Sequence, residues 1–116
     1  MADAMATPSD DELVSELGAA VEIDDEPWKR FVRIRVGHRE EIHLWLNAID
    51  RTVTVRWIVD EYMVVDVYRE SATDVKIETA DGQTYLLFEF GNRGSRSTLR
   101  VRVFPTVLIS DQLLVS

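Results

Sequence analysis

The chain has 116 residues and contains no cysteine, three prolines and five glycines. The absence of cysteine excludes disulfide bonds, thiolate catalysis and zinc sites with cysteine ligands. No apolar run approaches the roughly 18 residues that a membrane-spanning helix needs, so a membrane is not an expected partner. Cations are scarce as well: 13 Lys and Arg residues stand against 21 Asp and Glu residues, for a net charge of −8. This sign disfavours attraction of the whole molecule to nucleic acid and leaves a local basic patch as the route to such binding.

The residues that are present are typical of one folded domain. Apolar residues make up 46% of the chain, which is too many for a disordered segment, and the length suits a single hydrophobic core. The first residues have neither the basic region nor the apolar region of a signal peptide, so we expect a cytoplasmic protein. The sequence has no glycine-rich phosphate loop, no nucleophile elbow and no Ser/His/Asp set at a recognisable spacing. These observations favour a protein that is not an enzyme and that carries no cofactor.

The order of patterns along the chain predicts a tail followed by one domain. Ser9 and Glu12 have the spacing of a helix capping box, and Gly18 is a residue type that ends helices. From Trp28 onward apolar residues alternate with polar ones, which is the period of a half-buried strand. The predicted organisation is a flexible tail over residues 1–8 and a single domain over 9–116, divided into a short helix at 9–18, a linker at 19–27 and a β-rich core at 28–116.

The alternating segments predict an all-β fold. They are short, and turn residues separate them at intervals of roughly 8–12 residues, as in small barrels and sandwiches. We therefore expect a small antiparallel meander of seven to eight strands that closes into a barrel or sandwich, with the helix covering an edge or an open end. An α+β fold is the alternative, in which residues 60–70 are helical, because Asp60 can cap a helix. The C-terminal segment 107–115 is apolar enough for a last strand or for an interface.

Turn residues also predict which strand residues lie opposite each other. Asp81-Gly82 is a strong signal for a two-residue type I′ turn, and such a turn pairs Ile77 with Leu86. Other turns are expected at residues 37–41, 48–51, 60–62 and 91–97. The pairs that follow from these turns are Val36 with Ile42, Leu46 with Val53, Val59 with Met63, and Phe90 with Leu99. In each hairpin the apolar faces coincide, as they must where one face of a sheet is buried.

Basic and aromatic residues fall on the outward face of the first three predicted strands. The predicted pairing sets them in two rows across the sheet, which are Arg35–His43–Arg56 and Arg33–Trp45–Thr54. Like charges directly opposite each other destabilise a sheet, so the rows need a compensating feature. One such feature is neutralisation by acids, with Asp66 opposite Arg56; the other is a bound anion, with Trp45 as a stacking platform for single-stranded nucleic acid. We favour neutralisation, because exposed charged strands are usually solvated and paired.

Three other segments carry groups that chemistry could use. Arg93 and Arg96 lie in a Ser- and Gly-containing loop whose guanidinium and amide groups can hold a phosphate or carboxylate, although a solvated hairpin loop has the same composition. His38 and His43 are too few to complete a metal site, so no metal is predicted. The cluster at 60–62, Asp-Glu-Tyr, offers the groups of a general acid–base site, and an ordinary acidic turn looks the same.

The leading functional hypothesis is a non-enzymatic binding or adaptor module that acts through protein–protein contacts, with another protein or as a homodimer. Its expected interface strand is the C-terminal segment 107–115. A second hypothesis is binding of an anion or single-stranded nucleic acid, for which the candidate residues are Arg33, Arg35, His43, Trp45, Arg56, Arg93 and Arg96. A third is a small-ligand carrier or enzyme with a pocket inside the barrel and residues 60–62 at its mouth.

Overall fold

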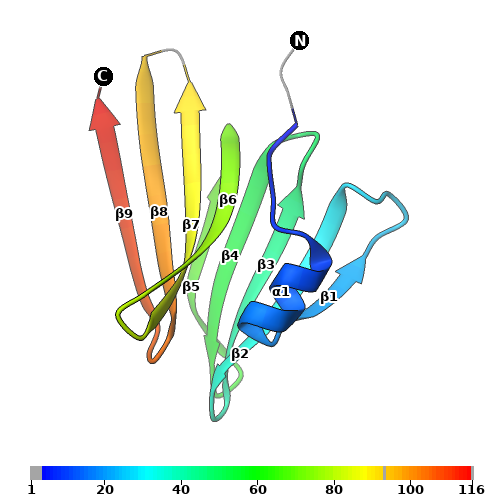
Figure 1. Cartoon of the computed structure of the whole chain (residues 1–116), viewed down its shortest axis with the longest axis vertical. Helices are drawn as coiled ribbons and strands as arrows, with labels where there is room; N and C mark the ends of the chain where they lie inside the picture. Colours follow the sequence, from blue (N-terminus) through cyan, green and yellow to red (C-terminus); the bar gives the residue numbers. More distant parts are fainter. Residues whose placement is uncertain (1–3, 93, 116) are drawn as a thin grey trace.

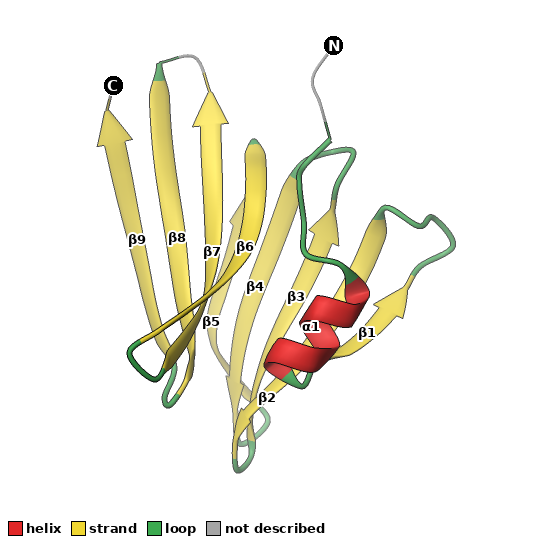
Figure 2. Ribbon diagram, viewed as in Figure 1, coloured by secondary structure: helices red, strands yellow, loops and turns green. Residues whose placement is uncertain are grey.

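The computed structural model describes residues 4–92 and 94–115, apart from the side chains at 92 and 113–115. The described chain forms one short helix, α1 (Asp10–Leu17), and two antiparallel sheets (Figure 1, Figure 2). The first sheet has five strands in chain order, which are β1 (Ala20–Ile23), β2 (Lys29–Gly37), β3 (Glu40–Asn47), β4 (Thr52–Val59) and β5 (Tyr62–Arg69). The second has four, also in chain order, which are β6 (Ala72–Ala80), β7 (Gln83–Asn92), β8 (Ser95–Phe104) and β9 (Leu108–Val115).

The prediction of a mostly β fold with one N-terminal helix is confirmed, but no closed barrel is found among the described residues. The strands β5 and β6 follow each other in sequence and belong to different sheets. Between them Ser71 adopts a left-handed backbone conformation, with φ 63°, at the corner where the chain passes from one sheet to the other. The barrel, and with it the hypothesis of a pocket inside a barrel, is therefore not confirmed. The helical alternative for residues 60–70 is wrong, because β5 occupies this segment.

The strand count also differs from the prediction. The described residues contain nine strands rather than seven to eight, because β1 forms inside the segment 19–27 that was predicted to be a linker. This strand pairs with β2 over four residues, with Val21 opposite Val32. The helix α1 has 8 residues, and no helix in the described ranges is long and apolar enough to cross a membrane.

The helix begins at the capping box that the sequence predicts. The Glu12 N–H donates to Ser9 Oγ, and the Ser9 N–H donates to the Glu12 carboxylate, each at 3.1 Å. The side chain of Leu13 is fully buried, so the helix is anchored in the core. Arg30, on β2, donates to Asp10 Oδ1 at 2.6 Å and holds the start of the helix against the inner face of the five-stranded sheet.

The segment that precedes the helix contacts both sheets. Met5 is 4% exposed, and its N–H donates to the carbonyl oxygen of Ala48, ahead of β4, at 2.8 Å. Ala6 forms a parallel bridge with Asp74 on β6, and the Val75 N–H donates to the Ala6 carbonyl at 2.8 Å. The prediction of a flexible tail over 1–8 therefore needs correction at Met5 and Ala6, while residues 1–3 lie outside the described chain.

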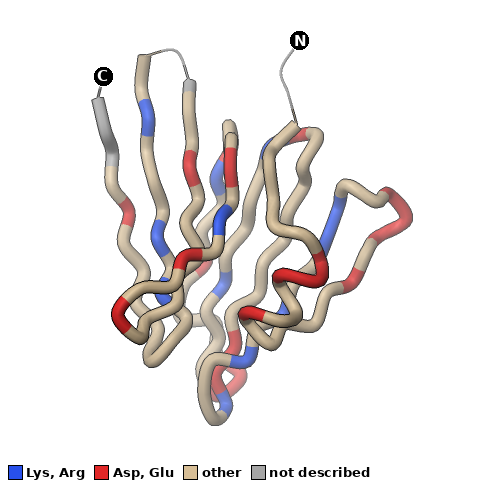
Figure 3. The backbone as a smooth tube through the Cα atoms, viewed as in Figure 1, with Lys and Arg blue, Asp and Glu red and all other residues tan. Residues whose placement is uncertain are grey.

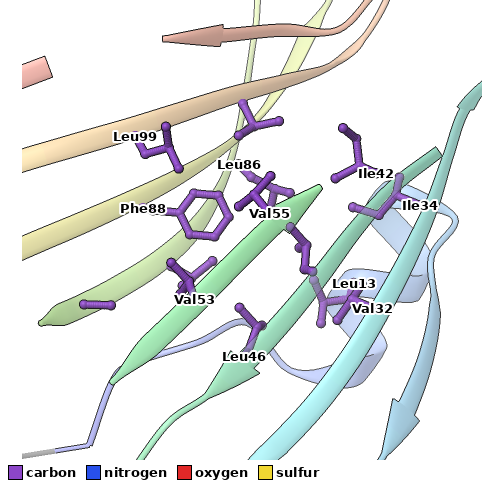
Figure 4. Packing of buried hydrophobic residues seen from close by; sticks show 14 of the residues in the cluster. Leu13, Val32, Ile34, Ile42, Leu46, Val53, Val55, Leu86, Phe88 and Leu99 are labelled. Carbon is purple, nitrogen blue, oxygen red and sulfur yellow. The ribbon is translucent and has the colours of Figure 1, made fainter. Parts of the chain in front are cut away.

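The hydrophobic core lies between the two sheets and under the helix (Figure 4). Because strand side chains alternate between faces, every second residue of the central strands points into it. Burial of each large side chain contributes about 1.5–3 kcal/mol. The largest fully buried side chains are Phe88, Leu13, Ile34, Ile42, Leu44, Leu86, Leu99, Val32, Val53, Val55 and Val101.

The predicted register is correct in two hairpins and wrong by two residues in the first. The pairs Ile77 with Leu86 and Leu46 with Val53 are confirmed. In the β2–β3 hairpin, however, Ile42 lies opposite Ile34 instead of Val36. The strands continue to Gly37 and Glu40, so the turn is shorter than the expected one. A β-bulge between Arg35 and Gly37 accommodates the one extra residue that β2 has there relative to β3.

Two later hairpins differ from the prediction for the same reason, a turn that is tighter than expected. Val59 lies opposite Tyr62 rather than Met63, because Asp60 and Glu61 alone form the turn. The pair of Arg56 with Asp66 is still correct, since a bulge at Trp57 and Ile58 compensates for the shorter turn. The other predicted pair, Phe90 with Leu99, is wrong: the structure pairs Phe88 with Leu99, because β7 and β8 extend to Asn92 and Ser95.

Candidate functional site

Basic and aromatic side chains gather on the outer face of the five-stranded sheet, away from the core. Their inward-facing neighbours Val32, Leu44 and Val55 are fully buried, and strand alternation therefore turns the intervening residues outward. Two rows cross this face from β1 to β5, and they are Glu22–Phe31–Trp45–Thr54–Tyr68 and Ala20–Arg33–His43–Arg56–Asp66. We call five of these residues the outer cluster: Phe31, Arg33, His43, Trp45 and Arg56.

The rings of the outer cluster are packed against one another. The ring centroids of Phe31 and Trp45 are 4.7 Å apart, and His43 meets Phe31 edge-on at 5.3 Å. The Arg56 guanidinium lies over the Trp45 ring at 4.8 Å, and that of Arg33 lies 5.7 Å from the Phe31 centroid. Cation–π and aromatic contacts of this kind favour one arrangement of the side chains. The surface is therefore ordered before any partner arrives.

Carboxylates neutralise the cations of this face. Glu41 lies between Arg33 and Arg35, with nitrogen–oxygen distances of 3.8 and 3.9 Å, and its Oε1 is 2.7 Å from His43 Nε2. The hydrogen bond with His43 holds the pKa of Glu41 below its ordinary value of 4.5, and the charges of His43, Arg33 and Arg35 act in the same direction. Arg56 Nε donates to Asp66 Oδ1 at 3.1 Å.

A cavity of about 380 Å³ lies beside the outer cluster, over the β1–β2 hairpin and the adjoining ends of β3 and β4. Phe31 and Trp45 belong to both the cavity and the cluster. The cavity is lined by Glu22, Ile23, Asp24, Lys29, Arg30, Phe31, Trp45, Leu46, Asn47, Thr52 and Thr54. Its lining combines two aromatic rings with two carboxylates, Glu22 and Asp24, and two cations, Lys29 and Arg30.

The structure brings together five of the seven residues predicted as a site, although not in the predicted rows. Arg33, not Arg35, shares a row with His43 and Arg56, and Trp45 lies opposite Phe31. Arg35 remains on the same face, with a side chain that is 81% exposed. The rows differ because the bulge and the tight turn of the β2–β3 hairpin shift the pairing of its strands by two residues. A shift of two residues leaves each side chain on its predicted face of the sheet.

The two remaining predicted residues do not join the cluster. Arg96 is exposed on β8, in the other sheet, and Arg93 lies outside the described residues. The sequence interpretation missed Phe31, and it considered Glu41 only as a possible metal ligand beside His43, not as the acid that neutralises Arg33 and Arg35. Phe31 carries a usable signal, because it precedes Val32 in the alternating pattern and so shares the outward face with Arg33.

The acidic turn that was considered as an acid–base site is solvent-exposed. Arg39 Nε lies 2.9 Å from Asp60 Oδ1 at a cavity of about 270 Å³. Tyr62 is 77% exposed and starts the edge strand β5, which also exposes Met63, Val64 and Tyr68. Within the described ranges, no group of three or more His, Cys, Asp or Glu residues is placed to hold a metal ion.

The C-terminal segment forms the edge strand β9, which pairs with β8 along its length. Val107 and Ile109 are partly buried against the core, so this segment helps to complete the fold. Leu108 is 51% exposed beside the turn. Its expected role as an interface strand stays a prediction.

Comparison with solved structures finds a similar fold in a chain of an assembly described as a contact-dependent growth inhibition toxin–immunity protein complex from Klebsiella pneumoniae 342. The alignment covers 97% of this chain and 100% of that chain, with a TM-score of 0.84 and 10% sequence identity. No protein-family model matches the sequence, and no curated protein matches it. At this identity the likeness shows a shared fold, in which both sheets and the helix are included.

Proposed function

We propose that the chain is an immunity protein, a binding module that acts in the cytoplasm and neutralises a toxin by forming a complex with it. The observation that carries this proposal is the whole-chain likeness, at TM-score 0.84, to a chain of a toxin–immunity complex. The net charge of −8 favours a basic partner for such a contact, because complementary charges speed association and make it selective.

The outer cluster is the surface that we propose for this contact. Trp, Tyr and Arg are the residues that most often dominate the energy of protein interfaces, and Trp45, Tyr68, Arg33 and Arg56 lie on this face. Trp45 is 37% exposed, so most of its ring is already held by neighbours while one part remains open to a partner. Side chains fixed on paired strands lose little conformational entropy on binding.

Nucleic acid is the less favoured partner for the same face. Arg33, Arg35 and Arg56 each have a carboxylate within 4.0 Å, in their ion pairs with Glu41 and Asp66. A phosphate would have to compete with these internal partners and with the negative charge of the whole chain. The surface of a partner protein, which presents both signs of charge, complements the guanidinium and carboxylate groups of this face better than a phosphate backbone does.

The test is coexpression with the product of the gene that neighbours this one. The proposal expects that product alone to stop bacterial growth, growth to return when this chain is present, and a 1:1 complex to be purified. A neighbour product that is harmless, or that is toxic and does not bind this chain, would contradict it. Light scattering on the free chain distinguishes this proposal from the alternative of a homodimer. The proposal expects a monomer of 13.3 kDa.

A further inference from the structure

The cavity beside the outer cluster has a distinct chemical character on each side. The rings of Phe31 and Trp45, stacked at a centroid distance of 4.7 Å, form its apolar side. Glu22 and Asp24, from β1 and the loop after it, form its acidic side. Its volume of about 380 Å³ lies within the range of roughly 300–1,000 Å³ that specific binding pockets occupy, and it suits one long side chain.

The two carboxylates of the cavity can meet a ligand: Asp24 Oδ1 accepts a hydrogen bond from the Asp25 N–H at 2.8 Å, which leaves its other oxygen for an incoming donor. In the described part of the chain, neither Glu22 nor Asp24 forms an ion pair, whereas the two cations that also line the cavity, Lys29 and Arg30, are each paired with another acid. Lys29 Nζ lies 3.0 Å from Glu26, and the hydrogen bond between them raises the pKa of Lys29 above its ordinary value. Arg30 is bound to Asp10 under the helix.

Charge is distributed unevenly around this end of the molecule. Figure 3 shows acidic residues concentrated on α1 and on the loop between β1 and β2, with few cations among them. The loop contributes Asp24, Asp25 and Glu26 within three consecutive positions. An approaching cation is therefore attracted to this end before it makes any direct contact.

The aromatic side of the cavity is suited to a planar cation. Arg33 and Arg56 already lie over Phe31 and Trp45, and both reach the rings from the row that contains His43. The cavity lies on the other side of the rings, next to the pair formed by Asn47 and Thr52. An incoming side chain can therefore contact the rings on the cavity side without displacing these arginines.

We propose that this cavity is the pocket for an arginine side chain presented by the protein partner. This inference rests on the proposed function and specifies the chemistry of the partner. The methylene stem of the arginine lies against Phe31 and Trp45, and its guanidinium lies between Glu22 and Asp24. Arginine suits the pocket better than lysine, because its planar guanidinium stacks on aromatic rings and its fork of donors can reach two carboxylates.

The direct test uses blocked amino acids and the full chain, with amide and indole signals followed by nuclear magnetic resonance at low salt. N-acetyl-arginine methylamide is expected to bind saturably, with a Kd on the order of 10 mM, and to shift the Trp45 indole signal. The lysine analogue should bind more weakly, and the citrulline analogue, which has the same shape without the charge, should not bind. A Trp45→Phe variant identifies the Trp45 indole signal. The Trp57 indole, which donates to Glu40 at 3.1 Å on another part of the sheet, should not move.

Variants then locate the site. The double variant Glu22→Gln, Asp24→Asn should weaken arginine binding at least fivefold, as estimated from the loss of two roughly equal charge contacts. The control Glu16→Gln removes one charge from the helix, outside the cavity, and should leave the Kd unchanged. Equal shifts with the arginine and citrulline analogues, no saturable shift at all, or full binding by the double variant would each overturn the proposal. These outcomes are independent of toxin neutralisation, so failure of the pocket and failure of the proposed function remain distinguishable.

Discussion

Arg69 is a single residue through which side-chain contacts join the two sheets. It lies at the end of β5, and its guanidinium donates to both carboxylate oxygens of Asp111 on β9, at 2.9 and 2.8 Å. It also donates to Ser97 Oγ on β8 at 2.7 Å and lies over the Phe90 ring at 4.5 Å. Four contacts to three strands of the opposite sheet make Arg69 a structural residue rather than a free surface cation.

The Arg69→Ala variant should lower the free energy of unfolding by about 1–3 kcal/mol, because it removes these contacts and leaves the buried Ser97 hydroxyl without this donor. Urea denaturation followed by fluorescence measures the change. Lys76→Ala is the matched control, since Lys76 also pairs with an acid, Glu89, at 2.9 Å but within one sheet and in solvent. Equal stability losses in the two variants would show that Arg69 has no special role between the sheets.

Glu41 makes a pH-dependent contribution to stability. The pKa of Glu41 is lowered, chiefly by the hydrogen bond with His43, so the folded protein binds its proton less readily than the unfolded chain does. The stabilisation is therefore complete above the ordinary pKa of 4.5 and is lost as the pH falls through the lower pKa of the folded state. Thermal unfolding between pH 6 and about 3 should show a smaller loss of Tm in Glu41→Gln than in the wild type. Parallel curves for the two proteins would contradict this assignment.

The sequence predicts most of the outer cluster because the face of a residue depends only on the parity of its position in a strand. Arg33, His43, Trp45 and Arg56 all keep their predicted face even though one register slips by two residues. The neutralising role of Glu41 is not visible in the sequence. It depends on a β-bulge and on a turn that places Arg39 at φ 66°, and no glycine marks that position.

At the scale of the element, turn chemistry decides which hairpins can be predicted. The Asp81-Gly82 turn has the residues that a type I′ conformation prefers, with φ 55° and 75°, and its register is predicted correctly. The turn of Asp60 and Glu61 adopts the same positive φ values, 50° and 72°; Asp60 suits its position as Asp81 does, but Glu61 stands where glycine is preferred. The sequence therefore gives no signal of this tight turn, and the expected three-residue turn is wrong.

The same comparison predicts opposite effects of substitution in the two turns. Glu61→Gly should raise the free energy of unfolding by up to about 1 kcal/mol, because glycine adopts φ 72° without steric cost. Gly82→Ala should lower it by about 1–2 kcal/mol; a Cβ there meets no atom within 4 Å, so the backbone conformation alone is responsible. Urea denaturation of both variants checks the signs. A destabilised Glu61→Gly protein would contradict the account of this turn.

At the scale of the whole molecule, the sequence predicts strands but does not specify how the sheets close. Alternation shows which side chains face a core, and a barrel and a pair of sheets present the same alternation. The decisive feature is the corner at Ser71, where β5 ends and β6 begins in the other sheet. Strand β1 was missed because four residues in an acidic segment carry too little pattern to separate a strand from a linker.

The outer face of the four-stranded sheet provides an internal control for the proposed binding surface. It also carries an aromatic ring under a guanidinium, since Arg100 lies 4.8 Å from the Tyr85 centroid. Its charges are paired across strands, as in Lys76 with Glu89 and Arg100 with Glu78. The cavity of about 380 Å³ and the stacked pair of Phe31 and Trp45 belong to the other sheet. A partner that recognises the outer cluster should therefore distinguish these two faces.

Calorimetric titration of the neighbouring gene's product, the toxin of our proposal, with this protein and two variants tests the central claim most directly. Trp45→Ala removes the ring at the centre of the outer cluster, and Tyr85→Ala removes a ring from the opposite sheet. Thermal unfolding of each variant first verifies that it is folded. The account predicts that Trp45→Ala raises the Kd at least about 30-fold, as for an interface hot spot, and that Tyr85→Ala changes it by less than about threefold. A Trp45→Ala protein that binds as tightly as the wild type would contradict the assignment of the outer cluster as the binding surface.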